Sequence, residues 1–387
     1  MDFKPADRIE ELPAYLFARL NEVRDAKIAE GVDVISLGIG DPDLPTPEAV
    51  TDRLAAAGRD AENHRYCDDG LPQYRAAVAA WYQRRFDITL DPAKEIVPLL
   101  GSKEGIAHLP VALINAGDYT LVPDPGYPVY AIGTELVGGQ VHYMPLTPEN
   151  RWLPDLDAIP DEIVAQAKLM WLCYPSNPTA AVAGHDFFER VVEFGNHHDI
   201  LICQDAAYSE VTFDGYRTGS ILEVPGAMEC VLEFHSLSKT YNMTGWRIGW
   251  AAGARPAIEA LTRLKSNLDS GIFAAVQEAG IAALELPESW IDARNAVYEK
   301  RRDRVLAALR AMDLEPEIPP ASLYVWTPVP GGYDSAAFAA KIIEEAGVIV
   351  TPGLGFGPGG DGYFRISLTT ADTRLAEALE RLGRLSF

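Results

Sequence analysis

A lysine with the potential for covalent chemistry lies in the segment HSLSKTYNMTGWRIG, which spans residues 235–249. Lys239 follows an apolar run, has small hydroxyl residues beside it and is followed by Arg247. Desolvation and neighbouring positive charge favour the neutral amine, which is a nucleophile toward an aldehyde. Ser236, Ser238 and Arg247 add two hydroxyls and a guanidinium, which suit a phosphate dianion. The alternative for a lone lysine is a solvated surface position.

Other polar residues have types that would complete a site for an aldehyde cofactor. Asp205 ends an apolar run, where a carboxylate needs a partner such as a protonated ring nitrogen; the alternative is a helix N-cap. Asn177 and Tyr208 are candidates to hydrogen-bond a phenolic oxygen. Gly101-Ser102-Lys103 opens a predicted helix, whose first backbone N–H groups would face a phosphate.

Two further side chains suggest a ring platform and a carboxylate clamp. Tyr127, in DPGYP, could stack on a flat ring, although turn tyrosines also simply pack. Arg365 lies inside the predicted strand YFRISL, where its guanidinium needs a partner. Either a substrate carboxylate or a protein acid could fill that role. These parts together predict pyridoxal 5′-phosphate bound to Lys239 as a Schiff base.

Alternating strand and helix patterns would position these residues. Short apolar runs rich in β-branched and aromatic residues predict strands at Ile96–Leu100, Tyr119–Val122, Val141–Met144, Lys168–Tyr174, Ile200–Cys203, Val231–His235 and Ile248–Ala251. Helical periodicity predicts helices at Glu104–Ile114, Val129–Val137, Asp186–His197 and Ala257–Leu264. The pattern predicts an α/β fold with a mostly parallel sheet between helices, and five polar loops would meet at the carboxyl ends of its strands.

A smaller α+β region is predicted after residue 287. It would contain a long helix over Trp290–Met312, strands at Ser322–Thr327, Val348–Thr351 and Tyr363–Ser367, and a helix capped by Asp334 or Ser335 that ends before Gly347. We expect residues 1–47 to form an N-terminal arm that belongs to this smaller domain, 48–286 the large cofactor-binding domain and 287–387 the small domain.

Composition limits the choice of partners. The 387 residues are 48% hydrophobic and carry a formal net charge of -23, which disfavours nucleic acid and anionic membranes. MDFKPADRIEEL lacks the features of a signal peptide, so a cytoplasmic location is expected. Cys67, Cys173, Cys203 and Cys230 lack CxxC spacing and are expected to be reduced and mostly buried; with scattered histidines, we expect no metal.

The motifs together resemble the class I/II aminotransferases of the aspartate aminotransferase-like fold, fold type I. The resemblance rests on HSLSKTYNMTGWRIG, DPGYPVY, GSKEG, SNPT and QDAAYSE, and extends over nearly the whole chain. YLFARL, LGIGDPDLPTP, LGSKEGIAHLP and KTYNMTGWRIG are most similar to the LL-diaminopimelate aminotransferase group. The combination is specific for fold and cofactor but much less so for substrate.

The resemblance implies a role for each matching position. Lys239 would carry the cofactor and move the substrate proton, Asp205 would hold the ring nitrogen, and Tyr127 would stack on the ring. It further implies the sets listed here: Asn177 and Tyr208 at the phenolic oxygen, Ser102, Lys103, Ser236, Ser238 and Arg247 around the phosphate with Tyr66 from a second subunit, Arg365 at the α-carboxylate, and Tyr15 and Gly40 beside the substrate. A homodimer with shared sites follows from the same resemblance.

Two positions depart from the family pattern. The usual NPTG is replaced by Asn177-Pro178-Thr179-Ala180, so a residue with a Cβ stands where glycine turns freely. The loop HRYCDDGLP is one residue shorter than usual and contains Asp68 and Asp69. Adjacent acids there favour a cationic substrate group such as a distal amine, a guanidinium or a sulfonium, unless they simply form a solvated acidic turn.

The expected function is the transfer of an amino group between an amino acid, cationic and diaminopimelate-like, and a 2-oxo acid. The alternative is a repurposed enzyme with the same cofactor that performs β- or γ-elimination, replacement or carbon–carbon bond formation, for example on S-adenosylmethionine. Ser236 and Lys239 also match the S-x-x-K pattern of serine acyl-enzymes, but the SDN and KTG elements of that class are missing.

Overall fold

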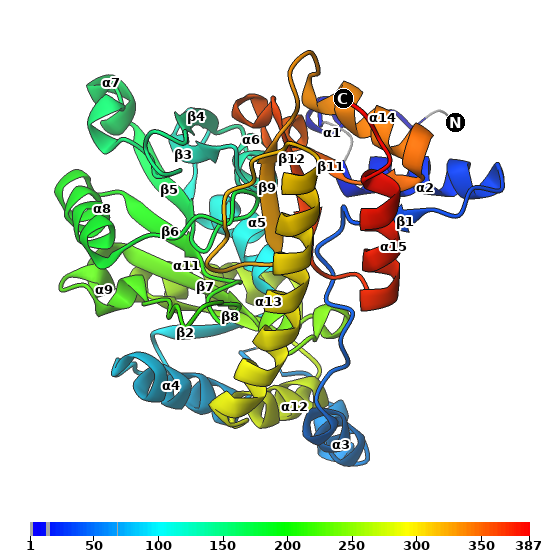
Figure 1. Cartoon of the computed structure of the whole chain (residues 1–387). Helices are drawn as coiled ribbons and strands as arrows, with labels where there is room; N and C mark the ends of the chain where they lie inside the picture. Colours follow the sequence, from blue (N-terminus) through cyan, green and yellow to red (C-terminus); the bar gives the residue numbers. More distant parts are fainter. Residues whose placement is uncertain (1–2, 13–15, 68) are drawn as a thin grey trace.

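A seven-stranded sheet forms the centre of the molecule (Figure 1). The computed structural model describes residues 3–12, 16–67 and 69–387. The strands lie in the order β2-β8-β7-β6-β5-β3-β4. Their bounds are β2 Ile96–Leu99, β3 Tyr119–Asp124, β4 Gln140–Pro145, β5 Ala167–Cys173, β6 Leu201–Asp205, β7 Val231–Ser236 and β8 Gly249–Gly253. Only β8 runs antiparallel to its neighbours, so the predicted mostly parallel sheet is confirmed.

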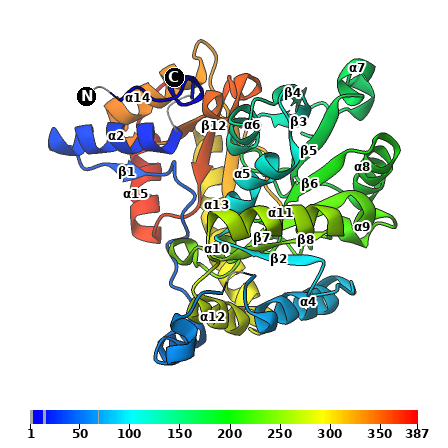
Figure 2. The same ribbon diagram turned by 180° about the vertical axis from the view of Figure 1, so that it is seen from behind.

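Helices cover both faces of this sheet, which explains why its central strands are buried. Every residue of β7 and of β8 is buried, as expected for parallel-type sheets covered on both sides. One face packs against α5 (Ser102–Leu113), α6 (Val129–Glu135) and α11 (Arg255–Leu268). Figure 2 shows α5 and α11 lying across the sheet on this side. The other face packs against α4 (Pro72–Phe86), α8 (His185–His198) and α12 (Ala274–Leu284).

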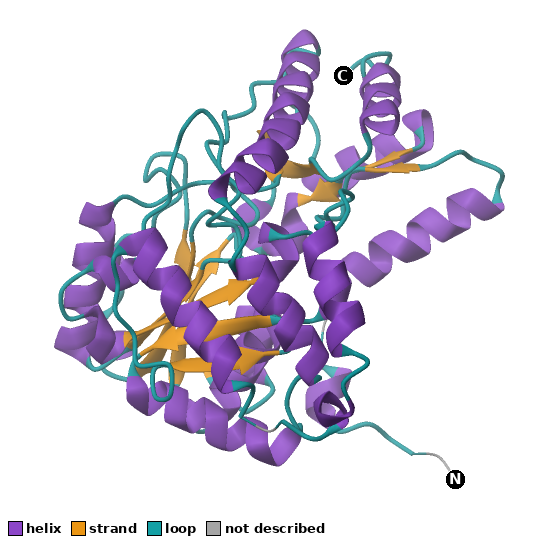
Figure 3. Ribbon diagram, turned by 90° about the horizontal axis from the view of Figure 1, so that it is seen from below, coloured by secondary structure: helices purple, strands orange, loops and turns teal. Residues whose placement is uncertain are grey.

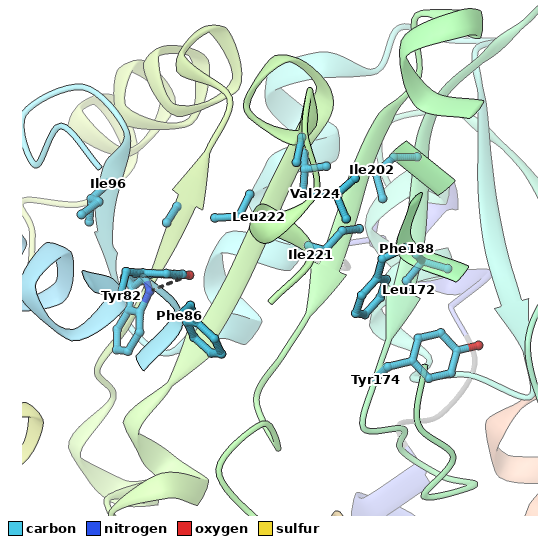
Figure 4. Packing of buried hydrophobic residues seen from close by; sticks show 14 of the residues in the cluster. Tyr82, Phe86, Ile96, Leu172, Tyr174, Phe188, Ile202, Ile221, Leu222 and Val224 are labelled. Carbon is cyan, nitrogen blue, oxygen red and sulfur yellow. Dashed lines mark hydrogen bonds between the residues drawn. The ribbon is translucent and has the colours of Figure 1, made fainter. Parts of the chain in front are cut away.

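The larger of the two hydrophobic layers joins aromatic side chains from the helices to branched side chains from the strands (Figure 4). Tyr82 and Phe86 come from α4 and Phe188 from α8, and they pack in one cluster with Leu172 of β5 and Ile202 of β6. All five side chains are buried. Such a continuous layer fixes the sheet and thereby the loops at its edge.

Short helices complete this part of the chain. They are α3 Glu48–Ala57, α7 Asp161–Val164, α9 Ala227–Cys230 and α10 Leu237–Thr240. The four predicted helices of this region are all present, with ends within a few residues of the expected ones.

A second, smaller group of strands and helices is set apart from the large sheet (Figure 3), and the blue and red ribbons of Figure 1 show that it contains residues from both ends of the sequence. A three-stranded antiparallel sheet has the order β11-β12-β9, and β1 pairs with β10 in parallel. The bounds are β1 Ile35–Ser36, β9 Tyr324–Pro328, β10 Val348–Ile349, β11 Thr351–Pro352, β12 Tyr363–Ser367, α1 Asp7–Glu10, α2 Leu16–Ala29, α13 Glu288–Ala311, α14 Ser335–Ala346 and α15 Asp372–Leu382. The single strand expected at Val348–Thr351 is wrong, because the chain changes partner there from β1 to β12.

Local signals in this region are confirmed. The Asp334 carboxylate caps α14 by accepting a hydrogen bond from the Ala337 N–H, and Gly347 ends the helix with a φ of 62°. The four cysteines are free; three are buried and Cys67 is half-buried. Among the described residues, no helix combines the length and the apolar character that a bilayer span requires.

The N-terminal segment crosses from the small sheet to the edge of the large one. The Leu37 N–H donates to the Ile349 carbonyl at 2.8 Å, and the Ser367 N–H donates to the Leu37 carbonyl at 2.7 Å. The Thr351 hydroxyl donates to the Gly38 carbonyl at 2.7 Å. These bonds fix the position of residues 39–41, which follow directly.

Ala180 adopts the backbone conformation that the family motif assigns to glycine. Its φ is 59°, in the left-handed region, and the residue is buried. For an L-residue this conformation costs about 1–2 kcal/mol, because Cβ approaches the following carbonyl oxygen. The substitution of glycine by alanine in this loop therefore stores strain beside Asn177.

We expect Ala180→Gly to raise the free energy of unfolding by about 1 kcal/mol or less, since relief of strain exceeds the extra flexibility of the unfolded chain. Thermal unfolding followed by circular dichroism would measure the change. Ala183→Gly is the matched control, because Ala183 is also buried but has no positive φ, and this variant should unfold earlier. A lower midpoint for Ala180→Gly would contradict the interpretation.

Candidate functional site

A cavity of about 480 Å³ lies at the carboxyl ends of the parallel strands of the large sheet. Loops after β2, β3, β5, β6 and β7 all reach it, as the sequence predicted. The residues that line it are Ile39, Gly40, Asp41, Ser102, Lys103, Tyr127, Asn177, Asp205, Ala207, Tyr208, Ser236, Ser238, Lys239, Thr244, Gly245, Arg247 and Tyr324. Ten side chains singled out from the sequence, together with Gly40, are therefore gathered at one site.

Lys239 lies on the short helix α10, directly after β7. Burial lowers the pKa of its ammonium to about 8, with Arg365 and Arg247 acting in the same direction and Asp41 and Asp205 opposing them. The Nζ atom donates a hydrogen bond to the Gly40 carbonyl. With this pKa, about a tenth of the amine is neutral at pH 7, far more than for an exposed lysine.

Asp205 occupies the end of β6, 6% exposed. Burial raises the pKa of its carboxyl to about 6, while hydrogen bonds from Tyr130 and from the Ala207 N–H lower it. The Tyr130 hydroxyl donates to Asp205 Oδ2 at 2.9 Å, and the Tyr130 ring stacks on Trp171 at a centroid distance of 5.0 Å. The carboxyl is thus rigidly held in a place that costs free energy when it is charged, and a cation in the cavity would compensate.

The polar groups expected around a phosphate surround the N-terminus of α5. Gly101 caps this helix with a φ of 77°, and a Cβ there would collide with the Arg247 guanidinium. The Arg247 Nη2 atom donates to the Leu100 carbonyl at 3.0 Å. Ser238 Oγ is buried with no hydrogen-bond partner in the structure. Ser236 also caps α10, since its Oγ accepts from the Ser238 N–H at 3.2 Å, a role the sequence analysis did not assign to it.

A charged cluster supports the same loop from behind. Glu104 Oε2 accepts from the Leu100 N–H and from the Lys265 ammonium, each at 3.0 Å. Lys265 also lies 3.0 Å from Asp269. Glu104, His108 and Asp269 come within 4.8 Å of one another, as metal ligands do, but the Lys265 ammonium already pairs with both carboxylates. We interpret this cluster as one that stabilises the loop before α5.

Arg365 lies behind the cavity wall and not on it. It is fully buried within β12, and its guanidinium donates to Asn177 Oδ1 at 2.5 Å and to the Gly38 carbonyl at 2.6 Å. The guanidinium carbon stands 3.9 Å from the centre of the Tyr324 ring. Its guanidinium is therefore held next to Asn177.

Tyr324 is a site residue that sequence reasoning missed. Its hydroxyl lies 2.7 Å from the Tyr208 hydroxyl, and a Cβ on Gly40 would collide with its ring. This close approach explains why Gly40 has no side chain. The only signal in the sequence was an aromatic residue in the predicted strand Ser322–Thr327, which ordinary core packing also explains.

Tyr130 and Asp41 were missed as well. Tyr130 stands three residues after Tyr127 in DPGYPVY, close enough for their rings to meet edge to face at 5.6 Å. Asp41 follows Gly40 and faces the cavity from the N-terminal segment, a location that depends on the pairing of β1 with β10. No periodic pattern in the sequence predicts that pairing.

Two predicted positions lie outside the cavity, and two others cannot be compared with it. Tyr66 is 87% exposed and is not among the cavity residues. Asp69 is likewise outside the cavity, and its carbonyl accepts from Arg75. Tyr15 and Asp68 lie outside the described residues.

Comparisons with known proteins show the family of this chain. Residues 32–382 match the family model "Aminotransferase class I and II". The chain is 55% identical over 385 residues to an LL-diaminopimelate aminotransferase of Moorella thermoacetica, covering 98% of each protein. A protein of the same name from Desulforudis audaxviator is 55% identical over 100% of both chains.

Solved structures give the same result. Substrate-bound BacF from Bacillus subtilis superimposes with a TM-score of 0.95 at 35% identity, over 99% of this chain and 98% of that one. The predicted fold type is therefore confirmed. With matches of this extent in both sequence and structure, the chain belongs to the class I and II aminotransferase family.

Proposed function

We propose that this protein is a pyridoxal phosphate-dependent aminotransferase that acts on a diaminopimelate-like amino acid and a 2-oxo acid. The observation that carries the proposal is the pair formed by Lys239 and Asp205, an amine and a carboxylate that line one cavity from neighbouring strand ends. Relatives at 55% identity are named for LL-diaminopimelate, which supports the substrate class. Elimination or replacement chemistry is not favoured, because these relatives are aminotransferases.

The residues present fit the cofactor. A phosphate would meet the α5 N-terminus, the unpartnered Ser238 hydroxyl and the side chains of Ser102, Lys103 and Arg247. The buried Asp205 carboxyl would gain the cationic partner that its position calls for. Tyr127 would provide the platform for the ring, with Asn177 and Tyr208 at its phenolic oxygen. When bound, pyridoxal phosphate supplies an aldehyde and a ring that stabilises negative charge at the amino acid's α-carbon.

The chain's own residues would then perform binding and proton transfer. Arg365 lies next to Asn177 and would bind the α-carboxylate through its planar fork. Lys239 Nζ, with its pKa lowered to about 8, can hold a proton and release it again at neutral pH. Asp205, held by Tyr130, would keep its charge at a fixed place throughout.

The same proposal includes a homodimer. Tyr66 is an exposed aromatic side chain remote from its own cavity, which supports a role at the partner's phosphate. We further propose the division into an arm (1–47), a large domain (48–286) and a small domain (287–387), with Tyr15 and Gly40 near the substrate.

Lys239 is expected to react with aldehydes at lower pH than other lysines do. Because burial lowers its pKa to about 8, the reactive neutral amine should accumulate as pH rises through about 8. Borohydride trapping of added pyridoxal phosphate on the cofactor-free protein, quantified by peptide mass spectrometry between pH 6 and 10.5, measures this. Exposed Lys168 is the internal control, and a Lys239 midpoint near 10.5 would contradict the assignment.

Transamination is tested by incubating the holoenzyme with LL-2,6-diaminopimelate and 2-oxoglutarate and by following the pyridoxamine form and the glutamate produced. We expect Lys239→Ala to lower the rate by at least about 100-fold, because proton transfer at the α-carbon loses its base. Lys168→Ala removes an exposed lysine and should leave the rate unchanged. Absence of amino transfer from any donor, or full activity of Lys239→Ala, would refute the proposal.

A further inference from the structure

The charges around the cavity are matched to the proposed cofactor and substrate, with one exception. Lys103 and Arg247 line the proposed phosphate position and Asp205 that of a ring cation. Arg365, behind the cavity wall and bonded to Asn177, is assigned to the α-carboxylate. Lys239 is reserved for proton transfer. The Asp41 carboxylate is the remaining charged group on the cavity lining, and none of these assignments uses it.

Asp41 is available for a ligand. In the part of the chain that the structure describes, its carboxylate has no hydrogen-bond or ion-pair partner, unlike Asp43 two residues later, which binds Arg301 at 2.6 Å. Its negative charge acts on Lys239, so it lies within electrostatic range of the reacting amine. Its backbone is fixed, because Gly40 accepts a hydrogen bond from Lys239 and residues 37–38 are bonded to the small sheet.

We infer that Asp41 recognises a cationic group at the far end of the amino-acid substrate. The inference rests on the proposed function and narrows its substrate to amino acids with a distal ammonium. Asp41 is exposed at the cavity, so solvent screens its charge, and a charge-assisted hydrogen bond to a ligand there changes affinity by up to about tenfold. Asp41 thus provides, within the same chain, the acidic character that the sequence suggested for Asp68 and Asp69.

The test compares two donors that differ only at the far end: LL-2,6-diaminopimelate and L-2-aminopimelate, which lacks the distal amine. The measured quantity is the ratio of their kcat/KM values, together with dissociation constants from spectral titration of the holoenzyme. Wild type should prefer diaminopimelate, and Asp41→Asn should reduce that preference about tenfold, since the amide keeps the shape but not the charge. Asp41→Glu should restore part of it.

A matched control and a second neutral variant separate a specific effect of Asp41 from a general loss of charge or of folding. Asp52→Asn removes an equal charge from an exposed position on α3 outside the cavity and should keep the wild-type ratio. Asp41→Ser serves if the asparagine variant folds poorly, as judged by thermal unfolding.

The unfavourable outcomes are distinguishable. If Asp41→Asn slows both donors equally and shifts the pH profile, Asp41 acts only on Lys239 and the inference is wrong, while the aminotransferase proposal stands. If wild type does not prefer diaminopimelate, the inference is equally wrong. If wild type transfers an amino group from neither donor nor from any other amino acid, the proposed function itself fails, and the inference fails with it.

Discussion

Two ionisable groups that are costly to bury, the Lys239 ammonium and the Asp205 carboxylate, are kept side by side at the ends of β7 and β6. Burial is the largest influence on both pKa values and, together with nearby charges and hydrogen bonds, brings them toward each other, to about 8 and about 6. Contacts with the surrounding structure hold both side chains in place. The apolar layers on both faces of the sheet fix the strands, Tyr130 holds the carboxyl, and the Arg294 guanidinium donates to the Lys239 carbonyl at 2.6 Å.

The residues of the large sheet could be predicted because their positions follow from local rules. Lys239, Asp205, Asn177 and Ser102 each stand just beyond an apolar run, and parallel strands bring such positions to one edge. Even the unusual backbone of Ala180 was visible in advance, since it replaces a glycine in a motif that turns. Local sequence therefore sufficed for the half of the site built on one sheet.

The other half depends on contacts between distant segments. Asp41 follows β1, a strand two residues long that pairs with β10 more than three hundred positions later, and Tyr324 lies in β9, which pairs with β12. Strands of that length carry almost no periodic signal. The same limit applies to charge. The sequence analysis singled out the acids of the Cys67 loop but not Asp41 within LGIGDPD, which lines the cavity.

The pairing of β1 with β10 also determines when, during synthesis of the chain, the cavity can be completed. One wall of the cavity, Ile39 to Asp41, is synthesised early but is held by Ile349, Thr351 and Ser367, which emerge from the ribosome near the end of translation. A nascent chain could assemble the large sheet while that wall is still unanchored. That side of the cavity would then close only in the last moments of synthesis.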